Sequence, residues 1–160
     1  MVKKITLTFL QILLLSSYFV LFFVEPFSFV LPFRLPLLLS YFVILLFITG
    51  LIIILFGILD LKVSQTKDYN NNTFTGFRFK GIYNYVKHPI YLGLIICLSA
   101  YAFYRLCIIN FTISILLGVI LYYKSKIEDI ELESQYDFYK NYNKKTGRFF
   151  PKFRNRNSRS

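Results

Sequence analysis

The chain alternates between long apolar runs and shorter polar segments rich in basic residues. The run from Ile5 to Val24 has 20 residues without a charge, and the run from Leu35 to Leu59 has 25. About 20 apolar residues are enough to cross the hydrocarbon core of a bilayer. Both runs therefore predict transmembrane helices. A signal peptide is the alternative for the first run, but its end, SSYFVLFFVEP, lacks the small residues of a cleavage site, which favours a retained span.

A third apolar tract extends for 35 residues from Pro89 to Tyr123, with Arg105 as its only charge. It predicts either one long tilted helix or a hairpin of two short spans that turns near Arg105 to Asn110. With four spans, 17 of the 19 Lys and Arg residues fall on one side of the membrane. Such a bias marks the cytoplasmic side. We therefore predict the hairpin, with the N-terminus, the middle loop and the C-terminus in the cytoplasm.

The sequence becomes charged directly after Tyr123, and no Pro or Gly occurs between Gly118 and Gly147. The fourth span is therefore expected to continue as a cytoplasmic helix. The predicted fold is an all-α integral membrane helix bundle with about four transmembrane helices. It forms a single domain over 1–160. Its predicted parts are two spans in 1–59, a cytoplasmic loop in 60–88, a helical hairpin in 89–123, a cytoplasmic helix and site segment in 124–151, and a basic tail in 152–160.

Composition supports the membrane assignment and limits the partners. Hydrophobic residues make up 56% of the chain, more than a soluble domain of this length can bury. The net charge of +11 lies mostly in the predicted cytoplasmic segments, where anionic lipid headgroups are the expected partner. Nucleic acid is not expected, since no recognisable binding module is present. Cys97 and Cys107, with a single histidine, do not make a zinc site, so no metal is predicted.

Two polar motifs flank the predicted hairpin. GIYNYVKHPIYLG, residues 81–93, contains the sole histidine, His88, and EDIELE, residues 128–133, contains four acids. An antiparallel hairpin would bring both motifs to one membrane face without burying a charge in lipid. An imidazole, carboxylates and tyrosines together can bind an ammonium group, a carboxylate and a cationic centre. S-adenosylmethionine carries all three groups.

The two motifs, with YKNYNKKTGRFFP after them, resemble the superfamily of isoprenylcysteine carboxyl methyltransferases and phospholipid methyltransferases. The family pattern is approximately Gly-x-Tyr-x-x-x-Arg-His-Pro-x-Tyr-x-Gly, then Glu-Glu-x-x-Leu-x-x-x-Phe-Gly-x-x-Tyr-x-x-Tyr, then a basic stretch ending in Arg-x-x-Pro. The match extends from Gly81 to Pro151, about the C-terminal half of the chain.

This resemblance implies a function for individual residues. Glu128 corresponds to the acid that holds the amino group of S-adenosylmethionine, and His88 would lie near the methionine end. Asp129 and Arg148 are the implied catalytic residues, with Arg148 binding an anionic group of the substrate. The full set of implied cofactor-binding residues is Gly81, Tyr83, His88, Tyr91, Gly93 and Glu128.

The chain departs from the family pattern at three places. Lys87 replaces the usual Arg, and Asp129 replaces the second Glu. Tyr136 and Asp137 stand at the Phe-Gly pair, and the tyrosines after them come one residue early, which indicates a one-residue deletion.

The predicted function is S-adenosylmethionine-dependent methyl transfer to a membrane-embedded or lipidic acceptor, in the first place the carboxyl group of a protein C-terminal isoprenylcysteine. The alternatives are N-methylation of a phospholipid ethanolamine, an NADPH-dependent enzyme of the sterol reductase type, and a non-catalytic membrane protein that retains the fold.

Overall fold

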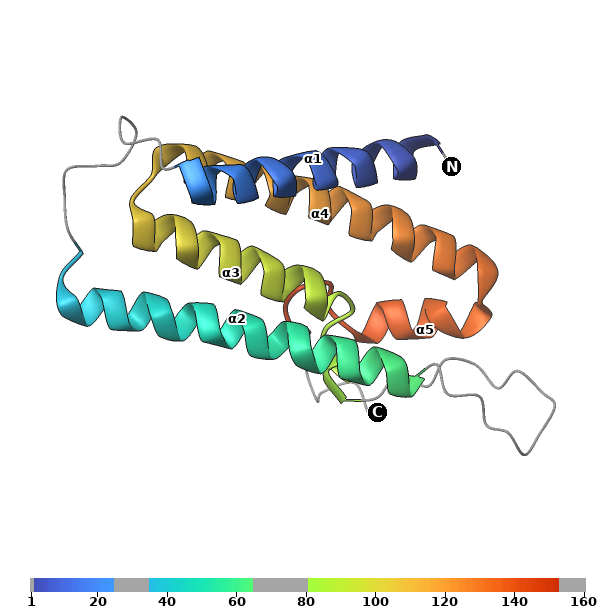
Figure 1. Cartoon of the computed structure of the whole chain (residues 1–160). Coiled ribbons are helices and arrows are strands. Elements are labelled where there is room, and N and C mark those ends of the chain that lie inside the picture. The colour runs from blue at the N-terminus through green and yellow to red at the C-terminus, as the bar shows by residue number, and fades with distance from the viewer. Residues whose placement is uncertain (1, 25–34, 65–80, 153–160) are drawn as a thin grey trace.

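The computed structural model describes residues 2–24, 35–64 and 81–152, and most of these residues are helical (Figure 1). Most of the predicted loop in 60–88 and nearly all of the basic tail lie outside the described residues. The described part contains no strand apart from one isolated bridge, and the predicted all-α fold is confirmed. The elements are α1 (Val2–Val24), α2 (Leu37–Ser64), the 3₁₀ turn η2 (Gly81–Asn84), α3 (Pro89–Arg105), α4 (Ile108–Gln135) and α5 (Asp137–Lys145).

The long helices expose apolar side chains to their surroundings. Helices α1, α2 and α4 are each long and apolar enough to cross a membrane, and α3 is shorter at 17 residues. Phe9 is 67% exposed, Leu38 87% and Ile115 59%. A soluble protein would not leave this much apolar surface in water. The protein is an integral membrane protein whose outer surface suits lipid.

The predicted hairpin is present and turns at Leu106. Leu106 takes the left-handed conformation, with φ 51°, and its N–H donates to the Phe103 carbonyl at 3.3 Å. Helix α4 starts directly afterwards and packs antiparallel on α3 (Figure 1). As predicted, α4 continues without a break past the apolar tract, until Tyr136 adopts an extended backbone and the chain reverses into α5.

Polar contacts hold α1 against the hairpin. Lys4 Nζ donates to Glu131 at 2.5 Å, Lys124 Nζ donates to Gln11 at 2.7 Å, and the Tyr18 hydroxyl donates to the Leu98 carbonyl at 2.7 Å. Helix α2 covers α3 on the other side of the bundle (Figure 1). The start of α1, the end of α2, the start of α3 and the end of α4 thus lie at one end of the molecule.

Glycine allows α2 and α3 to approach closely. A Cβ at Gly93 of α3 would lie 2.6 Å from the carbonyl oxygen of Gly50 and 2.7 Å from Ile54 Cγ1. A Cβ at Gly50 would lie 2.6 Å from Cys97 Sγ. These separations are shorter than van der Waals contact, so the close approach of the two helices depends on both glycines.

Gly93→Ala is therefore expected to destabilise the protein by about 1–3 kcal/mol, because the added methyl group overpacks the contact between α2 and α3. Gly118→Ala is the matched control, since nothing lies within 4 Å of a Cβ at that helical glycine. That change should be neutral or stabilising by up to about 1 kcal/mol. Thermal unfolding in detergent, followed by circular dichroism, measures both; equal midpoints for the two variants would contradict the packing argument.

Candidate active site

A short turn and a proline place His88 at the mouth of the hairpin. The turn η2 begins at Gly81, whose φ of 59° favours glycine. The Ile82 N–H donates to Asp60 Oδ2 at 2.7 Å, which ties the turn to the end of α2. Pro89 occupies the first turn of α3, where its missing N–H costs nothing. His88 consequently occupies the N-cap position of α3, although its side chain makes no capping hydrogen bond.

The C-terminal segment is hydrogen-bonded alongside this turn. The Lys87 N–H donates to the Gly147 carbonyl at 2.9 Å, and the His88 N–H donates to the Arg148 carbonyl at 3.1 Å. Val86 and Gly147 form an isolated parallel bridge. Arg148 is thereby brought beside His88, although the two are far apart in the sequence.

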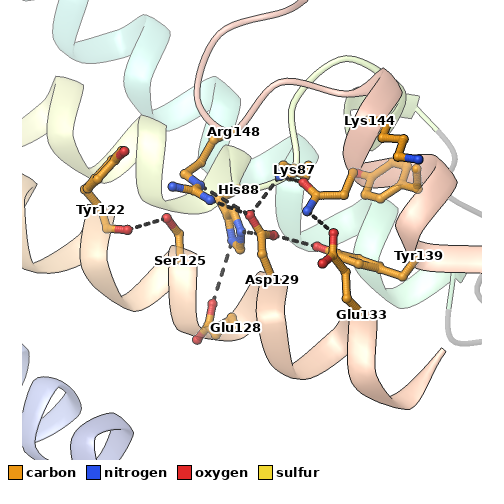
Figure 2. A network of polar contacts seen from close by, with 12 residues as sticks. Lys87, His88, Tyr122, Ser125, Glu128, Asp129, Glu133, Tyr139, Lys144 and Arg148 are labelled. Atoms are coloured by element: carbon orange, nitrogen blue, oxygen red, sulfur yellow. Dashed lines mark hydrogen bonds and ion pairs between the residues drawn. The ribbon is translucent and has the colours of Figure 1, made fainter. Parts of the chain in front are cut away.

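The carboxylate of Asp129 is the centre of a buried polar network (Figure 2). Asp129 is 2% exposed. Its Oδ2 accepts from Lys87 Nζ at 2.7 Å and from Arg148 Nη2 and Nε at 2.9 and 3.2 Å. Its Oδ1 accepts from the Tyr139 hydroxyl at 2.7 Å and lies 3.1 Å from His88 Nε2. A buried carboxylate has lost its water and needs hydrogen bonds and cations in place of it. These contacts of Asp129 link the start of α3 with α4, α5 and the C-terminal segment.

Lys87 extends this network toward α5. Its ammonium also donates to the Asn143 side-chain carbonyl, and the Asn143 amide donates to Glu133. Burial lowers the pKa of the Lys87 ammonium, and the hydrogen bond to Asp129 opposes that change. Burial, with the neighbouring Asp129 charge, raises the pKa of the Tyr139 hydroxyl, so Tyr139 stays a donor.

A second, more accessible layer lies next to the buried network. The Tyr91 hydroxyl donates to both carboxylate oxygens of Glu128, at 2.9 and 3.1 Å. The His88 ring stacks on the Tyr91 ring, with centroids 5.4 Å apart and planes within 3°. His88 Nδ1 lies 3.7 Å from Glu128 Oε2. The Glu128 side chain is 21% exposed, so an acid, an imidazole and an aromatic ring meet at an accessible position.

The sequence match now decides the family. A family model described as phospholipid methyltransferase matches residues 39–138, which include His88, Tyr91, Glu128 and Asp129. The chain belongs to the phospholipid methyltransferase family. Comparison with curated proteins and with solved structures finds no match. The resemblance to the superfamily of phospholipid and isoprenylcysteine carboxyl methyltransferases is thereby confirmed, and the protein is of this membrane methyltransferase type.

In this phospholipid methyltransferase family member, five of the implied site residues meet at the hairpin mouth. They are His88, Tyr91, Glu128, Asp129 and Arg148. The other three make different contacts. Gly93 lies between α2 and α3, a Cβ at Gly81 would overlap the Asp60 carboxylate, and buried Tyr83 accepts a hydrogen bond on its carbonyl from the Tyr142 hydroxyl. In the structure these three residues support the scaffold.

Several residues of the site were not identified as such from the sequence. Lys87 was noted only as a substitution, although it is the buried partner of Asp129. Tyr139 and Asn143 belong to α5, and their approach to α4 depends on the chain reversal at Tyr136. No helical spacing connects them with Asp129, so the only available signal was that Tyr139 corresponds to a tyrosine at the end of the second block of the family pattern, which Asn143 follows.

The described residues contain no group of three His, Cys, Asp or Glu side chains that could hold a metal ion. Cys97 and Cys107 are both buried, at 5% and 3% exposure. The cluster at the hairpin mouth consists of carboxylates, an imidazole, tyrosines and two cations.

Proposed function

We propose that this protein transfers a methyl group from S-adenosylmethionine to a lipidic acceptor at the membrane surface. The observation that carries the proposal is the meeting of His88, Tyr91 and Glu128 at an accessible position, supported from behind by the buried Asp129 network. Family membership independently supports a methyltransferase.

The residues present fit the cofactor. Glu128 is partly exposed, and a carboxylate has more acceptor positions than the Tyr91 hydroxyl uses, so it can also bind an ammonium group. Stacked His88 and Tyr91 provide aromatic surface of the kind that attracts a cationic centre.

The bound cofactor would supply an already activated methyl group. The task of the protein is then to align the acceptor with that group and to exclude water. A phospholipid amine must lose a proton before it is methylated, and another carboxylate or a tyrosine of the site is the candidate to accept it. A prenylcysteine carboxylate needs no base, and Arg148 would bind it instead.

The charge distribution supports a cytoplasmic position for this end of the bundle. Four basic residues contact groups of this end of the bundle: Lys4, Lys87, Lys124 and Arg148. By the preference of basic residues for the cytoplasmic side, we propose that the N- and C-termini are cytoplasmic. Anionic headgroups would be attracted to the same surface, and a lipidic acceptor would enter laterally from the bilayer.

Two acceptor classes remain, the amine of a phospholipid and the carboxylate of a prenylated cysteine. The carboxylates of the cluster suit the amine, and the partly exposed guanidinium of Arg148 suits the carboxylate. The family match supports membrane methyl transfer and does not choose between the two acceptors. Purified protein with methyl-labelled S-adenosylmethionine should be tested against phosphatidylethanolamine, a farnesylcysteine analogue and a small thiol. Label in one lipidic product supports the proposal and identifies the acceptor. No labelled product, together with saturable NADPH binding, would instead favour an enzyme of the sterol reductase type, and no binding of either cofactor would favour a non-catalytic protein.

A further inference from the structure

The single histidine of the chain lies between two carboxylates from successive residues of α4. Nε2 of His88 is 3.1 Å from Asp129 Oδ1, and Nδ1 is 3.7 Å from Glu128 Oε2. The two acids differ in environment, because the Asp129 side chain is 2% exposed and that of Glu128 is 21% exposed. One ring nitrogen therefore faces a buried network, and the other faces the accessible side.

We propose that Asp129 is a positioning residue that fixes His88 in the tautomer with its proton on Nε2, which leaves Nδ1 and Glu128 together as acceptors for the ammonium group of a ligand. Asp129 meets two cations at Oδ2, Lys87 and Arg148, and an ionised carboxylate can only accept hydrogen bonds. The nitrogen that faces it must then donate, and the hydrogen bond of one ring nitrogen determines the state of the other.

The carboxylate cannot readily turn away from this arrangement. Its Oδ2 is held by Lys87 and Arg148, and its Oδ1 also accepts from the Tyr139 hydroxyl at 2.7 Å. The ring of His88 is in addition stacked on Tyr91, which restricts its rotation. The position of the imidazole is thus restrained by the buried network and by stacking on Tyr91, and its tautomer is determined by Asp129.

The tautomer has a consequence at the accessible side. In the neutral imidazole with Nε2–H, Nδ1 carries a lone pair, so Nδ1 and Glu128 Oε2 are two acceptors facing each other. At 3.7 Å they are too far apart for a direct hydrogen bond. A primary ammonium has three donors and can bond to both. This step rests on the proposed function, whereas the tautomer itself can be tested without any cofactor.

Nuclear magnetic resonance of protein labelled with ¹⁵N-histidine tests the tautomer, and the sole histidine makes the assignment unambiguous. The spectrum should be recorded in detergent at an alkaline pH at which the ¹⁵N chemical shifts themselves show a neutral ring. We expect the proton on Nε2, in slow exchange with water. A proton on Nδ1, or a mixture of tautomers, in the wild-type protein would overturn the proposal.

Asp129→Asn should reverse the tautomer. Its carboxamide oxygen would face the cations of Lys87 and Arg148, and its NH₂ group would face Nε2 of His88, which would then have to accept. The proton would move to Nδ1, opposite Glu128, and the affinity for S-adenosylmethionine should fall roughly ten- to a hundredfold.

The control variant is Tyr139→Phe, which removes a donor to the same oxygen but keeps the carboxylate, so Nε2–H should remain. An unchanged tautomer in Asp129→Asn would contradict the positioning role. If Asp129→Asn does not fold, the wild-type spectrum decides. The expected tautomers without any binding of S-adenosylmethionine would support the positioning role and contradict the proposed function.

Discussion

Replacement of Glu128 by glutamine is expected to raise the Kd for S-adenosylmethionine by about ten- to a hundredfold, roughly the value of a strong hydrogen bond between charged groups. The carboxamide keeps the size of the side chain and can still accept a hydrogen bond from Tyr91, so the fold should be preserved. Its NH₂ group, however, would repel the ammonium group that the carboxylate attracts. Isothermal titration of the purified protein in detergent measures the change.

Glu131→Gln is the matched control for this experiment. Glu131 lies on the same helix as Glu128, but it pairs with Lys4, and both side chains of that pair are more than 40% exposed. The same chemical change at Glu131 should leave the Kd within about twofold, as surface charges contribute little. A wild-type Kd in Glu128→Gln, or an equal loss in both variants, would contradict the assignment of Glu128.

Asp129→Ala is expected to have the largest effect on stability. The change removes the common partner of Lys87 and Arg148, and the Lys87 side chain is only 4% exposed. Loss of one partner from a buried ion pair leaves an uncompensated charge, at a cost of about 3–5 kcal/mol. Denaturant unfolding in mixed micelles, followed by circular dichroism, gives the free energy of unfolding.

Lys4→Met provides the comparison for Asp129→Ala, since it breaks the exposed ion pair with Glu131. Such a pair is worth between 0 and about 1 kcal/mol. Asp129→Ala is therefore expected to lower the free energy of unfolding clearly more than Lys4→Met does. A similar, small loss of stability in both would mean that the Asp129 network does not hold α5 and the C-terminal segment in place.

The membrane helices were predictable because their signals are local. Uncharged runs near 20 residues define α1 and α2, and the uneven distribution of Lys and Arg favoured a hairpin over one long third span. The exact ends were less predictable. Leu106 makes the turn without a glycine, and Tyr136 ends α4 without a glycine or proline. Tyr136 is also where the sequence indicated a one-residue deletion, and the structure has its break between α4 and α5 there.

Helix topology alone predicted only the accessible layer of the site, whereas Asp129 and Arg148 of the buried layer were implied only by the family resemblance. His88 and Glu128 meet because an antiparallel hairpin returns its two ends to one place, which follows from topology. The buried layer depends on tertiary contacts. Tyr139 reaches Asp129 through the reversal at Tyr136, and Arg148 reaches it because Gly147 pairs with the backbone before His88. Neither contact has a periodic pattern in the sequence.

Binding of S-adenosylmethionine at the mouth of the α3–α4 hairpin is tested most directly by ultraviolet cross-linking of the labelled cofactor to the wild-type protein, followed by peptide mapping. Label is expected on the peptides that contain Tyr91 or Glu128, and an excess of unlabelled S-adenosylmethionine should remove it. Displaceable label confined to peptides of α1 or α2, or no displaceable label at all, would contradict the proposed site.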